Sequence, residues 1–172
     1  LIKVNNSVST IGKVAKAWRN QFDIPVMGIT GSNGKTSTKE LLKHMLSAQF
    51  NIHATEGNFN TSIGLPLTLL RLTKENTMSI LEMGANQPGD IAQLCEIALP
   101  THGLITNIAP AHLEGFGTIE AVAKTKGELF ACLAKGTSFI NAADYRVGAL
   151  EILGDAISFG LTPECDYPAD IH

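Results

Sequence analysis

The chain has 172 residues, of which 44% are hydrophobic and 17% charged, a composition typical of one globular domain and not of a disordered segment. Its net charge of −3 gives no basic surface, so nucleic acid is not an expected partner. Three widely spaced cysteines without a C-x-x-C pair argue against a disulfide framework and a structural zinc site.

The predicted elements begin with a helix and continue as an alternation of strands and helices. Apolar residues at 11, 14, 15 and 18 recur at helical spacing, which predicts a helix arriving from a preceding domain. Short apolar runs predict strands at 24–29, 51–54, 78–83, 103–108 and 138–142, and a short edge piece at 156–160. The helices are predicted at 35–49, 62–72, 88–98, 118–134 and 144–150.

Apolar strands separated by helices predict an α/β fold, with a mostly parallel sheet flanked by helices on both faces. In such sheets ligands bind beyond the carboxyl ends of the strands. No apolar run approaches ~20 residues, and the N-terminus lacks a signal-peptide pattern, so we expect a cytoplasmic protein without a membrane span.

The stretch "TGSNGKTS", residues 30–37, follows a predicted strand and opens a predicted helix. It departs from the common phosphate-loop pattern G-x-x-x-x-G-K-[ST], because Ile29 stands where that pattern has its first glycine. Glycines let the backbone turn and present its N–H groups to phosphate, the lysine can reach the β- and γ-phosphates, and the threonine can bind Mg²⁺. The alternative is a glycine-rich turn with an exposed lysine. The predicted ATP-contacting residues are Gly31, Ser32, Asn33, Gly34, Lys35, Thr36 and Ser37.

Two further side chains are predicted at the same edge of the sheet. Glu82 ends the strand predicted at 78–83, where its carboxylate can hold Mg²⁺ opposite Thr36, although an ordinary strand-end acid is the alternative. His112 follows the next strand, in "TNIAPAHLEGFG". A lone histidine is more often structural than a ligand, but its position near Lys35 and Glu82 favours a metal role.

Lys126 lies in the middle of the apolar face of the helix predicted at 118–134. At 100° per residue, six apolar residues lie within about 60° of it. The ordinary explanation is a packed stem with the ammonium reaching water. Burial without a partner would instead lower the pKa of the amine and favour its neutral form, which reacts with CO₂ to give a metal-binding carbamate.

These motifs together resemble the Mur ligases, ATP-dependent amide-forming enzymes of peptidoglycan precursor synthesis. The resemblance extends from residue 26 to about residue 147. "TGSNGKT" matches the phosphate loop of that family at every place, and it is shorter at its start than the common pattern. The blocks "EMGAN" and "AHLEGFG" are more specific, and they point to the branch that joins D-alanyl-D-alanine to a UDP-N-acetylmuramoyl-tripeptide.

The resemblance implies roles for the matching residues. Lys35, Glu82, His112 and Lys126 would be catalytic. Thr36 and Glu82 would hold the Mg²⁺ between the β- and γ-phosphates of ATP, and Glu82, His112 and a carbamylated Lys126 would serve a second Mg²⁺ position. Contacts to the nucleotide-sugar substrate are expected from Asn58, Asn60 and Thr61, although the family usually shows asparagine where this chain has Thr61.

The resemblance also implies an organisation in domains. Residues 1–23 would form a linker helix from a preceding domain, and residues 24–172 an ATP-binding central domain that is incomplete at its C-terminus, with the C-terminal domain absent. We expect such a fragment to be a monomer and to be inactive alone. Two alternatives stay open: another Mur-type or folylpolyglutamate-type ligase, and a nucleotide-binding regulatory module without ligase activity.

Overall fold

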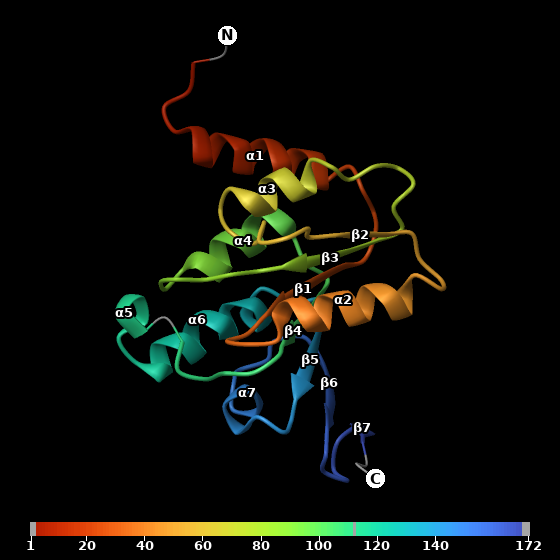
Figure 1. Ribbon diagram of the computed structural model, residues 1–172, viewed down its shortest axis with the longest axis vertical. Helices are drawn as coiled ribbons and strands as arrows, with labels where there is room; N and C mark the ends of the chain where they lie inside the picture. Colours follow the sequence, from red (N-terminus) through yellow and green to blue (C-terminus); the bar gives the residue numbers. More distant parts are fainter. Residues whose placement is uncertain (1–2, 112, 170–172) are drawn as a thin grey trace.

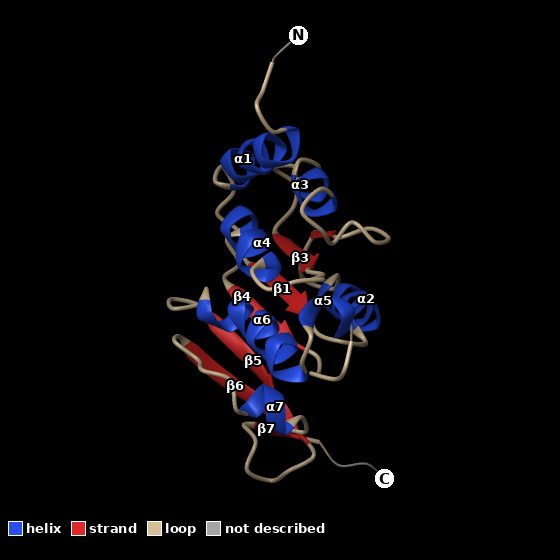
Figure 2. Cartoon of the chain, turned by 90° about the vertical axis from the view of Figure 1, so that its left-hand side faces the viewer, coloured by secondary structure: helices blue, strands red, loops and turns tan. Residues whose placement is uncertain are grey.

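The computed structural model describes residues 3–111 and 113–169, which form one sheet with helices against its faces (Figures 1 and 2). Seven parallel strands are arranged in the order β2-β3-β1-β4-β5-β6-β7. The strands are β1 Val26–Thr30, β2 Ile52–Ala54, β3 Met78–Glu82, β4 His102–Ile105, β5 Thr137–Asn141, β6 Asp155–Gly160 and β7 Tyr167–Pro168. The helices are α1 Ser7–Arg19, α2 Lys35–Leu46, α3 Gly64–Leu69, α4 Asp90–Ala98, α5 Leu113–Phe116, α6 Ile119–Ala131 and α7 Tyr145–Gly148.

Every strand predicted from the sequence is present, and the α/β class with a parallel sheet is confirmed. The strand predicted at 103–108 ends at Ile105, and other details were also wrong. The helix predicted at 62–72 is only α3, because beyond Leu70 the backbone closes with i→i+3 hydrogen bonds, from Arg71 N–H to the Thr68 carbonyl and from Leu72 N–H to the Leu69 carbonyl, both at 3.0 Å. The piece at 156–160 is the sixth strand and not an edge, since β7 pairs beyond it. The short helix α5 and the two-residue strand β7 were not predicted.

The neighbouring interior strands β1 and β3 are buried on both faces, which explains their continuous apolar character. All residues of β1 and β3 are buried. On one face, Met27, Ile29 and Ile80 pack against Leu42 and Leu46 of α2. The other face packs against α4 and α6 in the larger core cluster. β1 is therefore enclosed between α2 on one face and α4 and α6 on the other.

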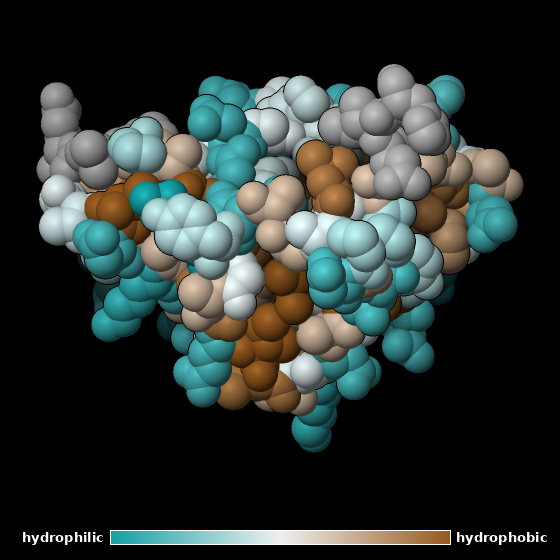
Figure 3. All heavy atoms as spheres, turned by 90° about the horizontal axis from the view of Figure 1, so that it is seen from below, coloured by the Kyte–Doolittle hydropathy of each residue, from teal (hydrophilic) through white to brown (hydrophobic). Residues whose placement is uncertain are grey.

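Helix cover is thinner toward β6 and β7. Residues 157–160 of β6 are half-buried, and Leu153 and Leu161 on either side of this strand are 52% and 56% exposed. Seen from this end, hydrophobic side chains form a strip between hydrophilic ones (Figure 3). Among the described residues, none of the helices is long and apolar enough to cross a membrane.

The buried side chain of Arg19 holds helix α1 against the rest of the domain through hydrogen bonds. The Arg19 side chain is 6% exposed, and its Nε donates to the Ala98 carbonyl at 3.0 Å, while its terminal N–H groups donate to the carbonyls of Phe22 and Ile24. The guanidinium thus satisfies a carbonyl that the end of α4 leaves free. Trp18 adds a hydrogen bond from Nε1 to the Leu72 carbonyl at 3.1 Å. α1 therefore packs on this domain, and its role as a linker from another domain stays a prediction.

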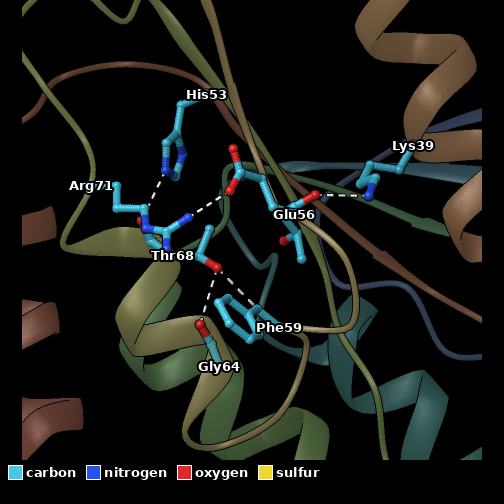
Figure 4. Close-up of polar contacts among 8 residues, drawn as sticks. Lys39, His53, Glu56, Phe59, Gly64, Thr68 and Arg71 are labelled. Carbon is cyan, nitrogen blue, oxygen red and sulfur yellow. Dashed lines mark hydrogen bonds and ion pairs between the residues drawn. The ribbon is translucent and has the colours of Figure 1, made fainter.

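His53 joins β2 to β3 and to α3, and Figure 4 shows its contact with Thr68 of α3. Its ring is 8% exposed, with Nε2 at 2.9 Å from the Thr68 carbonyl and Nδ1 at 2.8 Å from Ser79 Oγ. Because a carbonyl only accepts, Nε2 carries the proton and the Ser79 hydroxyl donates to Nδ1. Burial lowers the pKa of His53, so the folded protein favours its neutral form.

We expect this histidine to make stability pH-dependent. Its pKa is lower in the folded chain than in the unfolded chain, where it is about 6.5. The stabilisation is therefore complete above about pH 6.5 and is lost as the pH falls through the folded pKa, because the unfolded chain then binds the extra proton. Urea unfolding of the wild type and His53→Gln at about pH 7.5, 6.5 and 5.5 measures this contribution.

The difference in unfolding free energy between wild type and His53→Gln should shrink toward low pH. His44→Gln is the matched control, because His44 is exposed on α2 and should follow the wild type. A difference that stays constant over the whole pH range would contradict the assignment.

Candidate active site

The candidate site lies where the strand order switches direction, at the carboxyl end of β1. From β1 the chain goes to β2 and β3 on one side of the strand and later to β4 on the other side. The two connections leave a crevice between them, which is the usual ligand position in parallel α/β sheets. The loop of residues 31–34 leaves β1 at this point, and α2 begins directly after it.

Both loop glycines adopt backbone conformations that other residues avoid. Gly31 has φ +147° and Gly34 has φ +80°. A Cβ atom at Gly31 would lie 1.9 Å from Thr106 Oγ1, so the neighbouring loop also requires glycine there. Gly34 is the N-cap of α2 and supplies no side-chain cap. The first N–H groups of α2 are therefore free of a side-chain acceptor and can bind an anion.

The segment after β4 supports this loop through hydrogen bonds. The Ser32 N–H donates to the Asn107 carbonyl at 3.0 Å, and Ser32 Oγ donates to the Ala109 carbonyl at 2.8 Å. Thr106 Oγ1 donates to the Asn33 carbonyl at 2.6 Å, and Asn107 Oδ1 accepts from the Asn33 N–H at 3.0 Å. Sequence reasoning did not select Thr106 or Asn107. They fall inside the strand predicted at 103–108, which in the structure ends at Ile105, and their polar side chains in an apolar run were the available signal.

Glu82 and Thr36 lie together, as their positions in the sequence predicted. The Glu82 side chain is 3% exposed, and its Oε2 accepts a hydrogen bond from Thr36 Oγ1 at 2.9 Å. Its other oxygen accepts from Asn60 Nδ2 at 2.8 Å. A hydroxyl and a carboxylate oxygen side by side are ligands that Mg²⁺ prefers. Asn60, predicted to contact a substrate, uses its side-chain amide to orient this carboxylate.

Two lysines converge on the same small pocket from different helices. Lys35 Nζ donates to the Gly31 carbonyl at 2.7 Å. Lys126 on α6 is 3% exposed, and burial first and the neighbouring Lys35 second lower its pKa to about 8. The sequence placed Lys126 on the apolar face of the predicted helix, and the structure shows that the residue is indeed buried. The pocket has a volume of about 170 Å³ and is lined by Gly31, Ser32, Lys35, Asn60, Thr61, Gly84, Ala85, Asn86 and Lys126.

A second, polar pocket of about 330 Å³ adjoins the first and shares three of its lining residues. It is lined by Thr61, Ser62, Gly84, Asn86, Gln87, Asp90, Gln93 and Leu94. Amide and hydroxyl groups therefore continue from the lysine-lined pocket along the start of α4. This arrangement provides room for a polar molecule next to an anion site.

The remaining predicted residues are placed as follows. Ser37 is exposed in the first turn of α2, and Asn58 and Thr61 are exposed on the segment between β2 and α3. His112 lies outside the described residues. Within residues 3–111 and 113–169, histidine, cysteine, aspartate and glutamate form no group of three able to hold a metal. The hydroxyl of Thr36 beside the Glu82 carboxylate remains a pair of oxygen donors on the described part of the chain.

The chain resembles known proteins over most of its length. The family described as "Mur ligase middle domain" matches residues 29–167. The UDP-N-acetylmuramoyl-tripeptide–D-alanyl-D-alanine ligase of Escherichia coli is 44% identical over 140 residues, which are 81% of this chain and 31% of that protein. The chain therefore spans about a third of the length of this curated relative.

Solved structures agree with the sequence matches. The crystal structure of MurF ligase from Thermotoga maritima in complex with ADP superposes with a TM-score of 0.83 at 36% identity, covering 93% of this chain and 38% of that one. A MurF structure from Acinetobacter baumannii has a TM-score of 0.84 at 31% identity, covering 92% and 36% of the two chains.

Replacing Gly31 by alanine tests the loop geometry. We expect Gly31→Ala to lower the free energy of unfolding by about 2 kcal/mol, because the added Cβ meets Thr106 and the backbone conformation disfavours a side chain. Gly148→Ala is the matched control, since a Cβ there meets nothing within 4 Å. Urea unfolding measures both. Equal stability of the two variants would contradict the role of Gly31.

Proposed function

The chain belongs to the Mur ligase family, and we propose that it is the ATP-binding part of a ligase that joins D-alanyl-D-alanine to a UDP-N-acetylmuramoyl-tripeptide. The observation that carries the proposal is the phosphate loop, with Lys35, beside the hydrogen-bonded pair of Thr36 and Glu82. The activity, the substrates and a cytoplasmic location are proposed for the whole protein. Residues 24–172 would belong to its ATP-binding domain, and residues 1–23 would lead to it from a preceding domain.

We assign the ATP phosphates to the loop of residues 31–34 and the first turn of α2. The uncapped N–H groups there and the helix dipole favour a polyanion. Lys35 already lies over this loop, with Nζ on the Gly31 carbonyl, and can transfer its hydrogen bonds to the β- and γ-phosphates. Burial lowers the pKa of Lys35 and the Glu82 carboxylate opposes this shift, so the charged form has a neighbouring anion.

The described residues fit a magnesium ion at one position. The Thr36 hydroxyl and the Glu82 carboxylate are hard oxygen donors 2.9 Å apart, and Asn60 fixes the orientation of the carboxylate. An ion held there would neutralise charge on the β- and γ-phosphates. The protein's own contribution is to keep these two side chains in place before the nucleotide arrives.

A second ligand set is proposed around Lys126, with Glu82 and His112. An amine is a poor ligand for Mg²⁺, but burial lowers the pKa of Lys126 to about 8, so its neutral form is more populated than that of an exposed lysine. The neutral nitrogen can attack the carbon of CO₂ and release its proton to water, which leaves a carbamate with two anionic oxygen ligands. The reaction requires a neutral amine, and the buried position of Lys126 on the apolar face of α6 favours that form.

The proposed reaction has two transfers. A substrate carboxylate oxygen attacks the γ-phosphorus of ATP and ADP leaves, which gives an acyl phosphate. The amine of D-alanyl-D-alanine then attacks the acyl carbon, phosphate leaves, and the amine proton is lost to solvent. Positively charged Lys35 reduces the repulsion between the two anions of the first step. The polar pocket of about 330 Å³ is the proposed place for the carboxylate-bearing substrate; Thr61 lines it, Asn60 lines the adjoining pocket, and Asn58 is proposed to contact the substrate from the same segment of the chain.

Nucleotide binding should depend on Lys35. We expect Lys35→Ala to weaken ADP binding about 30-fold or more, because one charge-assisted hydrogen bond to phosphate contributes about 2 kcal/mol. Isothermal titration calorimetry with MgADP measures the change. Lys43→Ala is the matched control, since Lys43 is exposed near the other end of α2 and should bind as the wild type does. Equal affinities for all three proteins would refute the assignment of the loop.

Ligase activity should depend on Lys126. We expect Lys126→Ala in the whole protein to lower phosphate release at least about 100-fold, because an electrostatic group at the transferred phosphoryl would be lost. Lys124→Ala, exposed on the same helix, should keep wild-type activity. The wild type should lose activity in CO₂-free buffer and regain it with bicarbonate.

An assay of ADP formation by the whole protein tests the proposed reaction. ADP formation should require both the UDP-muramoyl tripeptide and D-alanyl-D-alanine. ADP formation with a folate substrate and glutamate would indicate the folylpolyglutamate-type ligase. ATP binding without turnover by the whole protein, with any of these substrates, would favour the regulatory module.

A further inference from the structure

Two cysteines from different helices meet on the side of the sheet that carries α4 and α6. Cys95 lies in α4 and Cys132 is the C-cap of α6. The two helices pack side by side (Figure 2). Both connect parallel strands of one sheet, so they run in the same direction.

Glu128 fixes the register of these two helices. Its two carboxylate oxygens accept hydrogen bonds from the N–H groups of Gly89 and Ala92 at the start of α4, both at 2.9 Å. Cys132 follows Glu128 by four residues, and Cys95 follows Ala92 by three. One helical turn beyond the anchored carboxylate, the two cysteines therefore face each other.

The two thiols share a cavity but differ in exposure. Both line a pocket of about 520 Å³, together with Lys16, Glu96 and Glu128 as its charged groups. Cys95 is 3% exposed, whereas Cys132 is exposed. The neighbouring Cys132 thiol and burial raise the pKa of Cys95, and the neighbouring Cys95 thiol lowers the pKa of Cys132, whose Sγ also donates to the Leu129 carbonyl at 3.0 Å. Cys132 is thus the accessible member and the better nucleophile.

We propose that Cys95 and Cys132 are a thiol-modification site, which hydroperoxides oxidise to a disulfide between α4 and α6 and which thiols reduce again. The site is independent of the proposed ligase activity. Cys165, the third cysteine, lies elsewhere, buried after β6 with its Sγ 3.2 Å from Thr162 Oγ1.

The oxidation proceeds in two steps. The Cys132 thiolate attacks one oxygen of the hydroperoxide, the O–O bond breaks, and the alkoxide or hydroxide takes up the proton lost by the thiol. This gives a sulfenic acid on Cys132. The sulfur of Cys95 then attacks the sulfenic sulfur, the S–O bond breaks, and water leaves with the Cys95 proton. Two thiols are oxidised while the hydroperoxide is reduced to an alcohol and water.

The bond would join the helix that carries Lys126 to the helix that starts beside the polar pocket. Lys126 lies six residues before Cys132 on the same rigid element. A covalent link also restricts the unfolded chain between residues 95 and 132. We therefore expect the oxidised protein to unfold at a temperature about 5 °C higher than the reduced protein.

Peptide mapping of the purified full-length protein tests the proposal. The reduced protein is treated with about 1–5 equivalents of hydrogen peroxide. Remaining thiols are then blocked with an alkylating reagent, and the protein is digested with trypsin without reduction. Trypsin cuts between the two cysteines, at Lys124 and Lys126, so a disulfide appears as two joined peptides. We expect this species to form at the same fraction over a range of protein concentrations and to disappear with dithiothreitol.

Variants distinguish the roles of the three cysteines. Cys165→Ser should form the bond as the wild type does. Cys95→Ser should accumulate a sulfenic acid on Cys132 that dimedone traps, whereas Cys132→Ser should leave Cys95 reduced at the same dose. Over-oxidation of Cys132 with Cys95 still reduced in the wild type, or bonds only between two copies of the chain, would overturn the proposal.

Discussion

The backbone register between β1 and its two neighbours determines where every residue of the candidate site lies. Ile29 pairs with Glu82 on β3 and with Leu104 on β4. Because the three strands are parallel and in this register, the loop after β1, the Glu82 carboxylate and the segment after β4 reach the same edge of the sheet. Thr36 meets Glu82 for this reason, although 46 residues separate them in the chain. A shift by one residue would turn Glu82 to the opposite face of its strand.

The site concentrates buried polar groups that stability alone would not select. Glu82 is 3% exposed, and hydrogen bonds from Thr36 and Asn60 compensate part of the cost of burying its carboxylate. Lys126, equally buried, has no hydrogen bond or ion pair within the described part of the chain. Buried Lys39 shows the contrast, since its Nζ donates to the Thr55 carbonyl at 2.7 Å. Buried ionisable groups that line a crevice are candidates for function, and Lys126 is such a group.

The sequence predicted most helices and strands because the pattern of apolar residues follows directly from which residues are buried. Continuous apolar runs predicted the fully buried β1 and β3, and helical periodicity predicted the burial of Lys126. The pairing of Thr36 with Glu82 followed from the rule that parallel strands end at one edge. These are statements about local pattern and topology, which a single sequence contains.

The features that were missed depend on contacts between distant segments. Thr106 and Asn107 support the phosphate loop, but only the loop conformation shows which polar residues after β4 reach it. The two-residue strand β7 is too short to produce an apolar pattern. The meeting of Cys95 with Cys132 required the register of α4 against α6, which Glu128 sets through backbone N–H groups. The spacing of residues along the sequence does not predict how α4 is aligned against α6.

The absent first glycine of the common phosphate-loop pattern has a structural reason. Ile29, which stands in that position, is completely buried and packs in the cluster on the α2 side of the sheet. The next residue is still part of β1, and its hydroxyl donates to the Met83 carbonyl at 2.9 Å. The chain therefore first needs an unusual backbone conformation at Gly31, where Thr106 also excludes a side chain. A glycine at position 29 would remove core packing without easing any turn, so the shorter loop is the one that this strand can support.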